Sequence, residues 1–93
     1  MWTRETIIQL LNAHKKRATY SAVAGCCGST AQVVMFGLDR CPECSWVVAQ
    51  RTGRPSSYSE DQIHPECRRQ IAEDLWNFES DATRLEEWLR GLA

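Results

Sequence analysis

Apolar side chains recur at helical spacing over the first sixteen residues. Thr3 can cap a helix there, because its hydroxyl can accept from a backbone N–H of the first turn, and the pattern continues to about Lys16. The apolar face of this predicted helix is spaced by three and four residues along the chain. It consists of Ile7, Leu10, Leu11 and His14.

Two short helices joined by a glycine turn are predicted next. The first begins behind Thr19 and ends at Gly28, since glycine readily takes the left-handed conformation that closes a helix. Ser29 can cap the second, which is predicted from Thr30 to about Phe36. Two short helices around a glycine turn have the spacing of a helix-turn-helix.

A short β-hairpin is predicted over residues 45–58. The aromatic and β-branched run 46–48 is typical of a strand, and Gly53 supplies a turn position that can take a positive φ. Residues 55–58 then return as a second strand. Pro55 puts that strand at a sheet edge, because proline cannot donate a backbone hydrogen bond.

Two helices are predicted after the hairpin, to serve as core packing or as a partner surface. Pro65 favours the start of the first, and Ser80 or Asp81 can cap the second. The apolar stripe of the first contains Ile71, Leu75 and Phe78, and that of the second contains Leu85, Trp88, Leu89 and Leu92.

These elements predict one α+β domain over residues 1–93, a mainly helical winged helix-turn-helix with a short hairpin and two C-terminal helices. The first helix and the helix-turn-helix occupy 1–37, the hairpin 45–58 and the C-terminal helices 59–93. The 43% apolar content, with four Trp, suffices for one modest core. No apolar run reaches the roughly 18 residues that cross a membrane, and no signal peptide is recognised. We expect a cytoplasmic protein without a membrane partner.

The net charge of −1 conceals a strong asymmetry along the chain. Residues 1–58 contain seven Lys and Arg against three acids, whereas residues 59–93 contain four Arg against nine acids. Charge separated in this way can leave a basic face for phosphates. The alternative is that the acidic C-terminal part pairs with the basic half.

Two stretches of this chain are informative together. The first comprises residues 18–28 and Ala-Gln-Val-Val at 31–34, and the second comprises Cys-Ser-Trp-Val-Val at 44–48 and Thr-Gly-Arg at 52–54. Together they resemble the DNA-binding domain of the O6-alkylguanine-DNA alkyltransferases, and the chain is closer in size to the alkyltransferase-like proteins. The second stretch is similar to the Pro-Cys-His-Arg-Val-Val segment of the family's active site. The similarity covers about residues 17–58.

The resemblance implies a winged helix-turn-helix that binds the minor groove and extrudes a base into a pocket. Tyr20 would then press on a phosphate, and Gln32 would occupy the place of the family's intercalating arginine, without its charge. Ser45 replaces the histidine that would activate the neighbouring thiol of Cys44. We therefore expect a DNA-binding protein that is not an enzyme.

The predicted DNA contacts combine basic residues with the helix thought to approach the groove. They are Lys15, Lys16, Arg17, Tyr20, Ser29, Thr30, Gln32, Val33, Arg51 and Arg54. The alternative function is a protein-interaction or dimerisation module. A homodimer would form through the third helix or through the C-terminal helices, whose candidate surface residues are Trp76, Phe78, Trp88 and Leu92.

A second candidate chemistry is a structural zinc site. Cys41 and Cys44 form a C-x2-C pair, and His64 and Cys67 form an H-x2-C pair further along the chain. Zinc favours four such thiolate or imidazole ligands in a tetrahedron, and a clip of this kind would stabilise a small domain. The alternative is that all five cysteines are unliganded thiols and that the protein has no cofactor.

Overall fold

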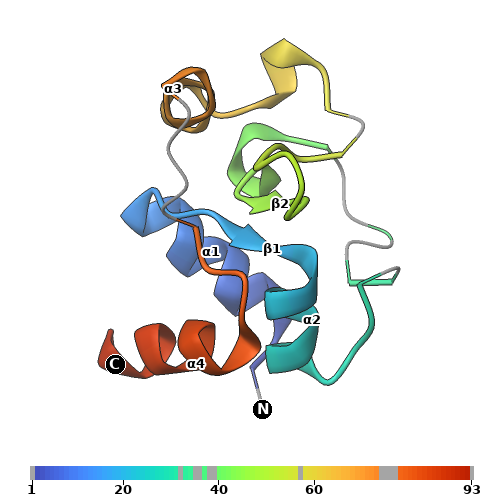
Figure 1. The fold of residues 1–93 in the computed structure, drawn as a ribbon, viewed down its shortest axis with the longest axis vertical. Coiled ribbons are helices and arrows are strands. Elements are labelled where there is room, and N and C mark those ends of the chain that lie inside the picture. The colour runs from blue at the N-terminus through green and yellow to red at the C-terminus, as the bar shows by residue number, and fades with distance from the viewer. Residues whose placement is uncertain are drawn as a thin grey trace.

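The computed structural model describes residues 2–31, 33–34, 37, 40–56, 58–73 and 78–92. Within these residues the chain forms four α-helices, two short 3₁₀ helices and two short strands (Figure 1). In chain order they are α1 Arg4–His14, β1 Ala18–Thr19, α2 Tyr20–Cys27, η1 Pro42–Cys44, β2 Val47–Val48, η2 Glu60–Gln62, α3 Pro65–Ala72 and α4 Ala82–Gly91.

The first two helices begin and end where the local sequence predicts. Thr3 Oγ1 accepts from the N–H of Thr6 at 3.3 Å and begins α1. The hydroxyl of Thr19 accepts from the N–H of Ala22 at 3.1 Å and begins α2. Gly28 ends α2 in the left-handed conformation, with φ 70°. These signals lie within a few residues of the element they delimit, so the sequence alone suffices to find them.

Two C-terminal helices are present as predicted, but α3 ends at Ala72, so the predicted stripe is wrong at Phe78, which lies in a bend outside the helix. Pro65 is the first residue of α3, and Asp81 caps α4 by accepting from the N–H of Thr83 at 3.0 Å. Leu85 and Leu89 of α4 are completely buried. The predicted stripe residue Leu75 and the candidate surface residue Trp76 lie outside the described part of the chain.

The predicted hairpin is wrong for the residues that the structure describes, because β2 pairs with a distant strand. β2 lies parallel to β1, with Ala18 opposite Val47 and Thr19 opposite Val48. The other side of β1 is occupied by Glu79, whose carbonyl oxygen accepts from the N–H of Thr19 at 2.9 Å. Val47 and Val48 are fully buried, as is usual for short parallel strands that carry a continuous apolar run.

Residues 49–56 form a tight loop in place of a hairpin. The N–H of Ala49 donates to the carbonyl oxygen of Arg54 at 2.9 Å, and the N–H of Gly53 donates to the carbonyl oxygen of Ala49 at 2.8 Å. Gly53 has φ 68°, which confirms the predicted need for glycine at this turn. Neither this loop nor Tyr58 belongs to a strand.

The predicted third helix, from Thr30 to Phe36, is not formed by its described residues. They lie in turns, where the N–H groups of Val33 and Val34 both donate to the carbonyl oxygen of Thr30, at 3.1 and 3.0 Å. The buried Val34 and the bond from Arg4 Nη1 to its carbonyl oxygen anchor the segment to α1. Tertiary contacts thus override a weak helical preference. The observed class is α+β, with four helices and a two-stranded parallel sheet.

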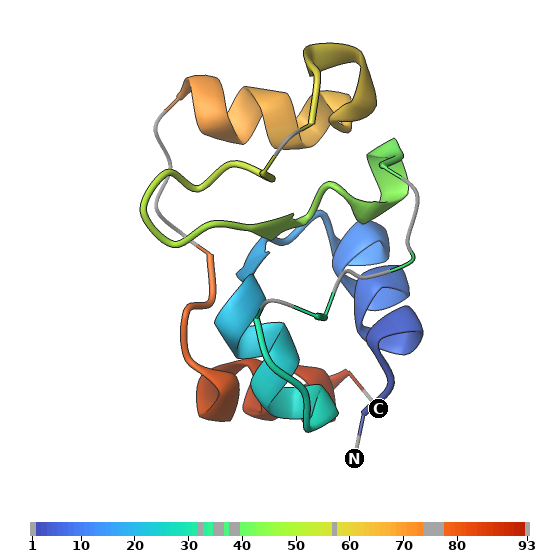
Figure 2. The same cartoon turned by 90° about the vertical axis from the view of Figure 1, so that its right-hand side faces the viewer.

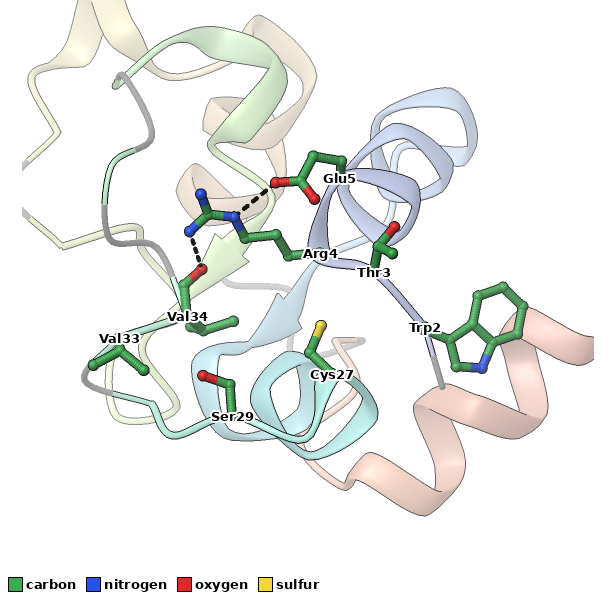
Figure 3. A pocket seen from close by; sticks show the side chains of 8 residues that line it. All are labelled: Trp2, Thr3, Arg4, Glu5, Cys27, Ser29, Val33 and Val34. Carbon is green, nitrogen blue, oxygen red and sulfur yellow. Dashed lines mark hydrogen bonds and ion pairs between the residues drawn. The ribbon is translucent and has the colours of Figure 1, made fainter.

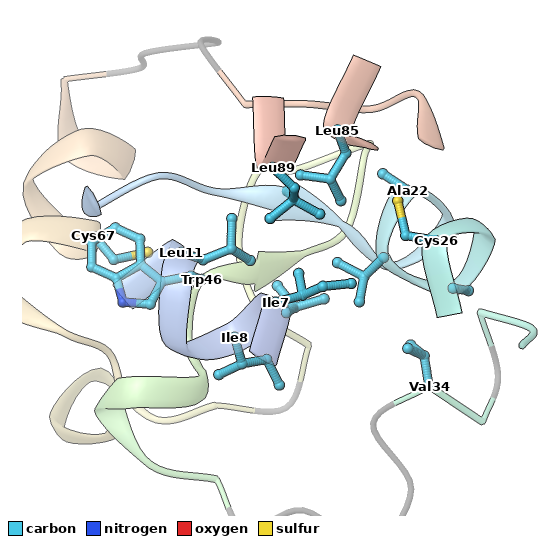
Figure 4. Packing of buried hydrophobic residues seen from close by; sticks show 14 of the residues in the cluster. Ile7, Ile8, Leu11, Ala22, Cys26, Val34, Trp46, Cys67, Leu85 and Leu89 are labelled. Carbon is cyan, nitrogen blue, oxygen red and sulfur yellow. The ribbon is translucent and has the colours of Figure 1, made fainter. Parts of the chain in front are cut away.

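The core lies where α1, α2 and α4 surround the two strands, while α3 covers the opposite end of the molecule (Figures 1 and 2). Trp46 is fully buried, and its indole Nε1 donates to Asn12 Oδ1 at 2.9 Å, which satisfies its one polar atom. The labelled members of this core in Figure 4 are Ile7, Ile8, Leu11, Ala22, Cys26, Val34, Trp46, Cys67, Leu85 and Leu89.

Glycine at position 25 permits the close approach of α2 and α4. A Cβ at Gly25 would lie only 2.5 Å from the Cβ of Ala82. The thiol of Cys26 also donates to the carbonyl oxygen of Ala82 at 3.4 Å. Ala82, the first residue of α4, therefore packs directly against the backbone of α2.

Candidate nucleic-acid interface

The loop of residues 49–56 carries two of the predicted phosphate contacts at an open cavity. Arg51 and Arg54 are exposed, and both line a cavity of about 620 Å³. Tyr58 also lines this cavity. Arg54 forms an exposed ion pair with Glu60 at 2.6 Å, a kind of contact that typically contributes less than about 1 kcal/mol and exchanges readily. The loop can therefore present two guanidinium groups to an anionic ligand.

Tyr20 is held against the same loop. Its hydroxyl oxygen accepts from the N–H of Ser56 at 2.8 Å, across 36 residues of sequence. The tyrosine is the first residue of α2 and is half-buried. The fold therefore brings Tyr20 next to the loop that contains Arg54.

Arg17, which is one of the predicted phosphate contacts, is buried in the structure. Only 2% of Arg17 is exposed, and its guanidinium carbon lies 5.0 Å from the centre of the Phe78 ring. Nη1 donates to the carbonyl oxygen of Gly53 at 2.7 Å, and Nε donates to Gln70 Oε1 at 3.2 Å. Burial lowers the pKa of Arg17. This cation stabilises the fold beneath the loop and is not available to a phosphate.

The two lysines next to Arg17 have different surroundings. Lys16 is half-buried, with Nζ 3.7 Å from a carboxylate oxygen of Glu79 and 5.5 Å from the centre of the Trp88 ring. Lys15 is exposed, and its Nζ donates to the carbonyl oxygen of Asn12 at 2.8 Å. The pairing of Lys16 with Glu79 matches the alternative in which part of the acidic half neutralises the basic half.

The segment after α2 presents a small polar surface and one large apolar side chain. Ser29 and Thr30 are exposed, and Val33 is 51% exposed, which singles it out among the large hydrophobic residues that the structure describes. Ser29 and Val33 line a second cavity of about 340 Å³, beside the start of α1 (Figure 3). The predicted contact Gln32 lies outside the described residues.

The four candidate zinc ligands are not brought together. The sulfurs of Cys41, the N-cap of η1, and Cys44, its last residue, are 3.2 Å apart. His64 uses Nδ1 to accept from the N–H of Glu66 at 3.1 Å, which caps α3. The buried Cys67 thiol donates to the carbonyl oxygen of Ser45 at 3.6 Å. Among the described residues, no group of three or more His, Cys, Asp or Glu side chains is arranged to hold a metal ion.

Sequence reasoning missed the roles of Tyr58 and Ser45. Tyr58 was predicted only as the end of a strand, yet it lines the cavity of the loop. Ser45 is fully buried, where its hydroxyl donates to the carbonyl oxygen of Pro42 at 2.7 Å and accepts from the N–H of His64 at 3.0 Å. An aromatic residue within a serine-rich stretch was the available signal for Tyr58. No local signal distinguishes a buried serine from an exposed one.

Comparison of the chain with family models, with curated proteins and with solved structures finds no match. None of the helices within the described ranges is long and apolar enough to cross a membrane.

Proposed function

We propose that this protein binds DNA through the loop of residues 49–56. The observation that carries the proposal is the placement of Arg51 and Arg54, exposed at a cavity that also contains Tyr58, on a loop held by Tyr20. Arginine forms bidentate contacts with phosphate oxygens and remains charged at any physiological pH. The resemblance to the alkyltransferase family supports the same partner.

The segment that contains Ser29, Thr30 and Val33 is the candidate for contact with a groove of the DNA. Its side chains are small or apolar, which suits a minor groove better than hydrogen-bonded readout of the major groove. Val33 exposes about half of its surface. An exposed apolar residue of this kind can wedge between base steps.

We propose that the protein binds DNA but does not transfer an alkyl group from DNA to Cys44. Transfer of an alkyl group from a DNA base to a cysteine requires a base or a cation that stabilises the attacking thiolate. The residue after Cys44 is Ser45, whose hydroxyl is buried and already donates to the carbonyl oxygen of Pro42. That hydroxyl is no base for the thiol.

The test is a fluorescence-anisotropy titration with a short labelled duplex at about 50 mM and about 200 mM salt. We expect Arg51→Gln and Arg54→Gln each to weaken binding and to reduce the salt slope by about one. Val33→Ser should weaken binding without changing the slope, because it removes no charge.

The matched control is Arg84→Gln, since Arg84 is exposed on α4 beside Glu79, Asp81 and Glu87. This variant should bind like the unmodified protein. Absence of binding at low salt, or equal losses in all three arginine variants, would exclude the loop as a DNA contact. If Val33→Ser instead shifts a monomer–dimer equilibrium in sedimentation, the dimerisation module becomes the better description of that segment.

A further inference from the structure

Cys41 and Cys44 lie at the two ends of one rigid 3₁₀ turn. Their sulfurs are 3.2 Å apart, which is inside the sum of two sulfur van der Waals radii. Cys41 is the N-cap of η1 and Cys44 is its last residue, and the short turn between them brings the two thiols together. Both side chains are partly exposed, so a small molecule in solution can reach them.

The surrounding contacts hold this turn in place. The N–H of Cys44 donates to the carbonyl oxygen of Cys41 at 3.0 Å, and Pro42 fixes one backbone angle between them. The carbonyl oxygen of Pro42 accepts from the N–H of Ser45 at 3.2 Å and from its hydroxyl at 2.7 Å. The two thiols are therefore preorganised before any reaction, and little conformational entropy is lost when they are joined.

Two of the other three cysteines are buried. Cys26 and Cys67 each donate to a backbone carbonyl oxygen. Burial raises the pKa of Cys26 and of Cys27, and it raises the pKa of Cys67 to about 11. A buried thiol is less accessible to a small disulfide in solution.

We propose that Cys41 and Cys44 form a reversible dithiol–disulfide couple that exchanges with low-molecular-weight disulfides. One cysteine thiolate attacks a sulfur of the small disulfide, whose S–S bond breaks and releases one thiolate. The second cysteine thiolate then attacks the resulting mixed disulfide. The Cys41–Cys44 bond forms, and the second small thiolate leaves.

This exchange balances without any further reactant. The two protein sulfurs are oxidised and lose their protons to solvent, and the small disulfide is reduced to two thiols. The reverse sequence, with an excess of the small thiol, restores the dithiol. The proposal does not depend on DNA binding.

The test is an equilibrium titration of the folded full-length chain in glutathione buffers of graded oxidised-to-reduced ratio. Samples are alkylated, digested with trypsin and analysed by mass. Trypsin cleavage after Arg40 and Arg51 leaves Cys41 and Cys44 together on the peptide 41–51. Cys26 and Cys27 fall on the peptide 18–40, and Cys67 falls on the peptide 52–68, because trypsin does not cleave between Arg54 and Pro55.

We expect Cys41 and Cys44 to form a disulfide at a defined glutathione ratio, which removes two hydrogens from the peptide 41–51. Addition of reduced glutathione should restore both thiols. Cys41→Ser and Cys44→Ser should each abolish this mass change and leave a persistent glutathione adduct on the remaining thiol. The control variant Cys27→Ser should behave like the unmodified protein.

Two results would overturn the proposal. One is a peptide 41–51 that remains reduced, or that carries one glutathione on each cysteine, at every ratio. The other is the same midpoint in urea-unfolded protein as in folded protein, because preorganisation by the turn would then contribute nothing.

Discussion

The guanidinium of Arg17 donates from Nη1 to the carbonyl oxygen of Gly53 at 2.7 Å. This bond joins the segment that follows α1 to the loop that carries Arg51 and Arg54. Gln70 of α3 completes the arrangement: its Oε1 accepts from Arg17 Nε at 3.2 Å and its Nε2 donates to the carbonyl oxygen of Lys15 at 2.9 Å. The buried cation therefore connects three segments that are distant in sequence.

Replacement of Arg17 by lysine should destabilise the protein. Lysine retains the charge but cannot donate to both Gly53 and Gln70 in the planar geometry of the guanidinium. It would leave a buried polar partner unsatisfied, and we expect the free energy of unfolding to fall by about 2–4 kcal/mol. Urea unfolding followed by circular dichroism measures this loss.

The control for Arg17 is its neighbour Lys15, which is exposed. Lys15→Met should change the free energy of unfolding by no more than about 0.5 kcal/mol. Similar losses in the two variants would mean that the contacts of Arg17 contribute no more than surface charge does.

Replacement of Gly53 by alanine tests the other side of the same contact. Gly53 has φ 68°, and a Cβ there would lie 2.9 Å from Arg17 Nη1 and 3.2 Å from Phe78 Cε1. Backbone strain and crowding both act against the substitution, so the free energy of unfolding should fall by about 1–3 kcal/mol.

The matched control is Gly91→Ala at the end of α4, where an added Cβ meets no atom within 4 Å. Alanine is the better helix former, so this variant should be neutral or more stable by up to about 1 kcal/mol. Thermal or urea unfolding of the two variants side by side gives the comparison. A Gly53→Ala variant as stable as Gly91→Ala would contradict the tight packing beneath the loop.

The buried thiol of Cys67 should make stability fall at alkaline pH. Burial raises its pKa from 9.0 to about 11, so above pH 9 the unfolded chain loses this proton while the folded chain retains it. The folded state then binds more protons than the unfolded state, and the free energy of unfolding decreases as the pH rises. The effect amounts to about 2 kcal/mol between pH 9 and 11.

The experiment is urea unfolding from pH 8 to pH 11, in steps of about one pH unit, for the unmodified protein and for Cys67→Ala. The variant loses some packing at every pH, but its stability should depend less on pH above 9. Parallel curves for the two proteins would show that another group causes the alkaline loss, with Tyr58 as the next candidate because burial raises its pKa as well.

Local signals in the sequence predict where α1, α2 and α4 begin and where α2 ends. Thr3, Thr19, Gly28 and Asp81 each act on backbone groups within four residues of themselves, so their effect does not depend on the rest of the fold. The apolar stripe of α4 and the turn at Gly53 were found for the same reason. These local signals were enough to predict a small domain of mixed α and β structure.

How these elements pack together depends on contacts between distant parts of the chain. Val47 and Val48 read as a strand, but their pairing with β1 required a partner 29 residues earlier in the chain, which no local pattern specifies. The burial of Arg17, the turns after α2 and the separation of Cys41 and Cys44 from His64 and Cys67 have the same origin. A long side chain, a strand edge or a thiol can pair with many different groups. Tertiary packing determines which of these groups lies close enough to become its partner.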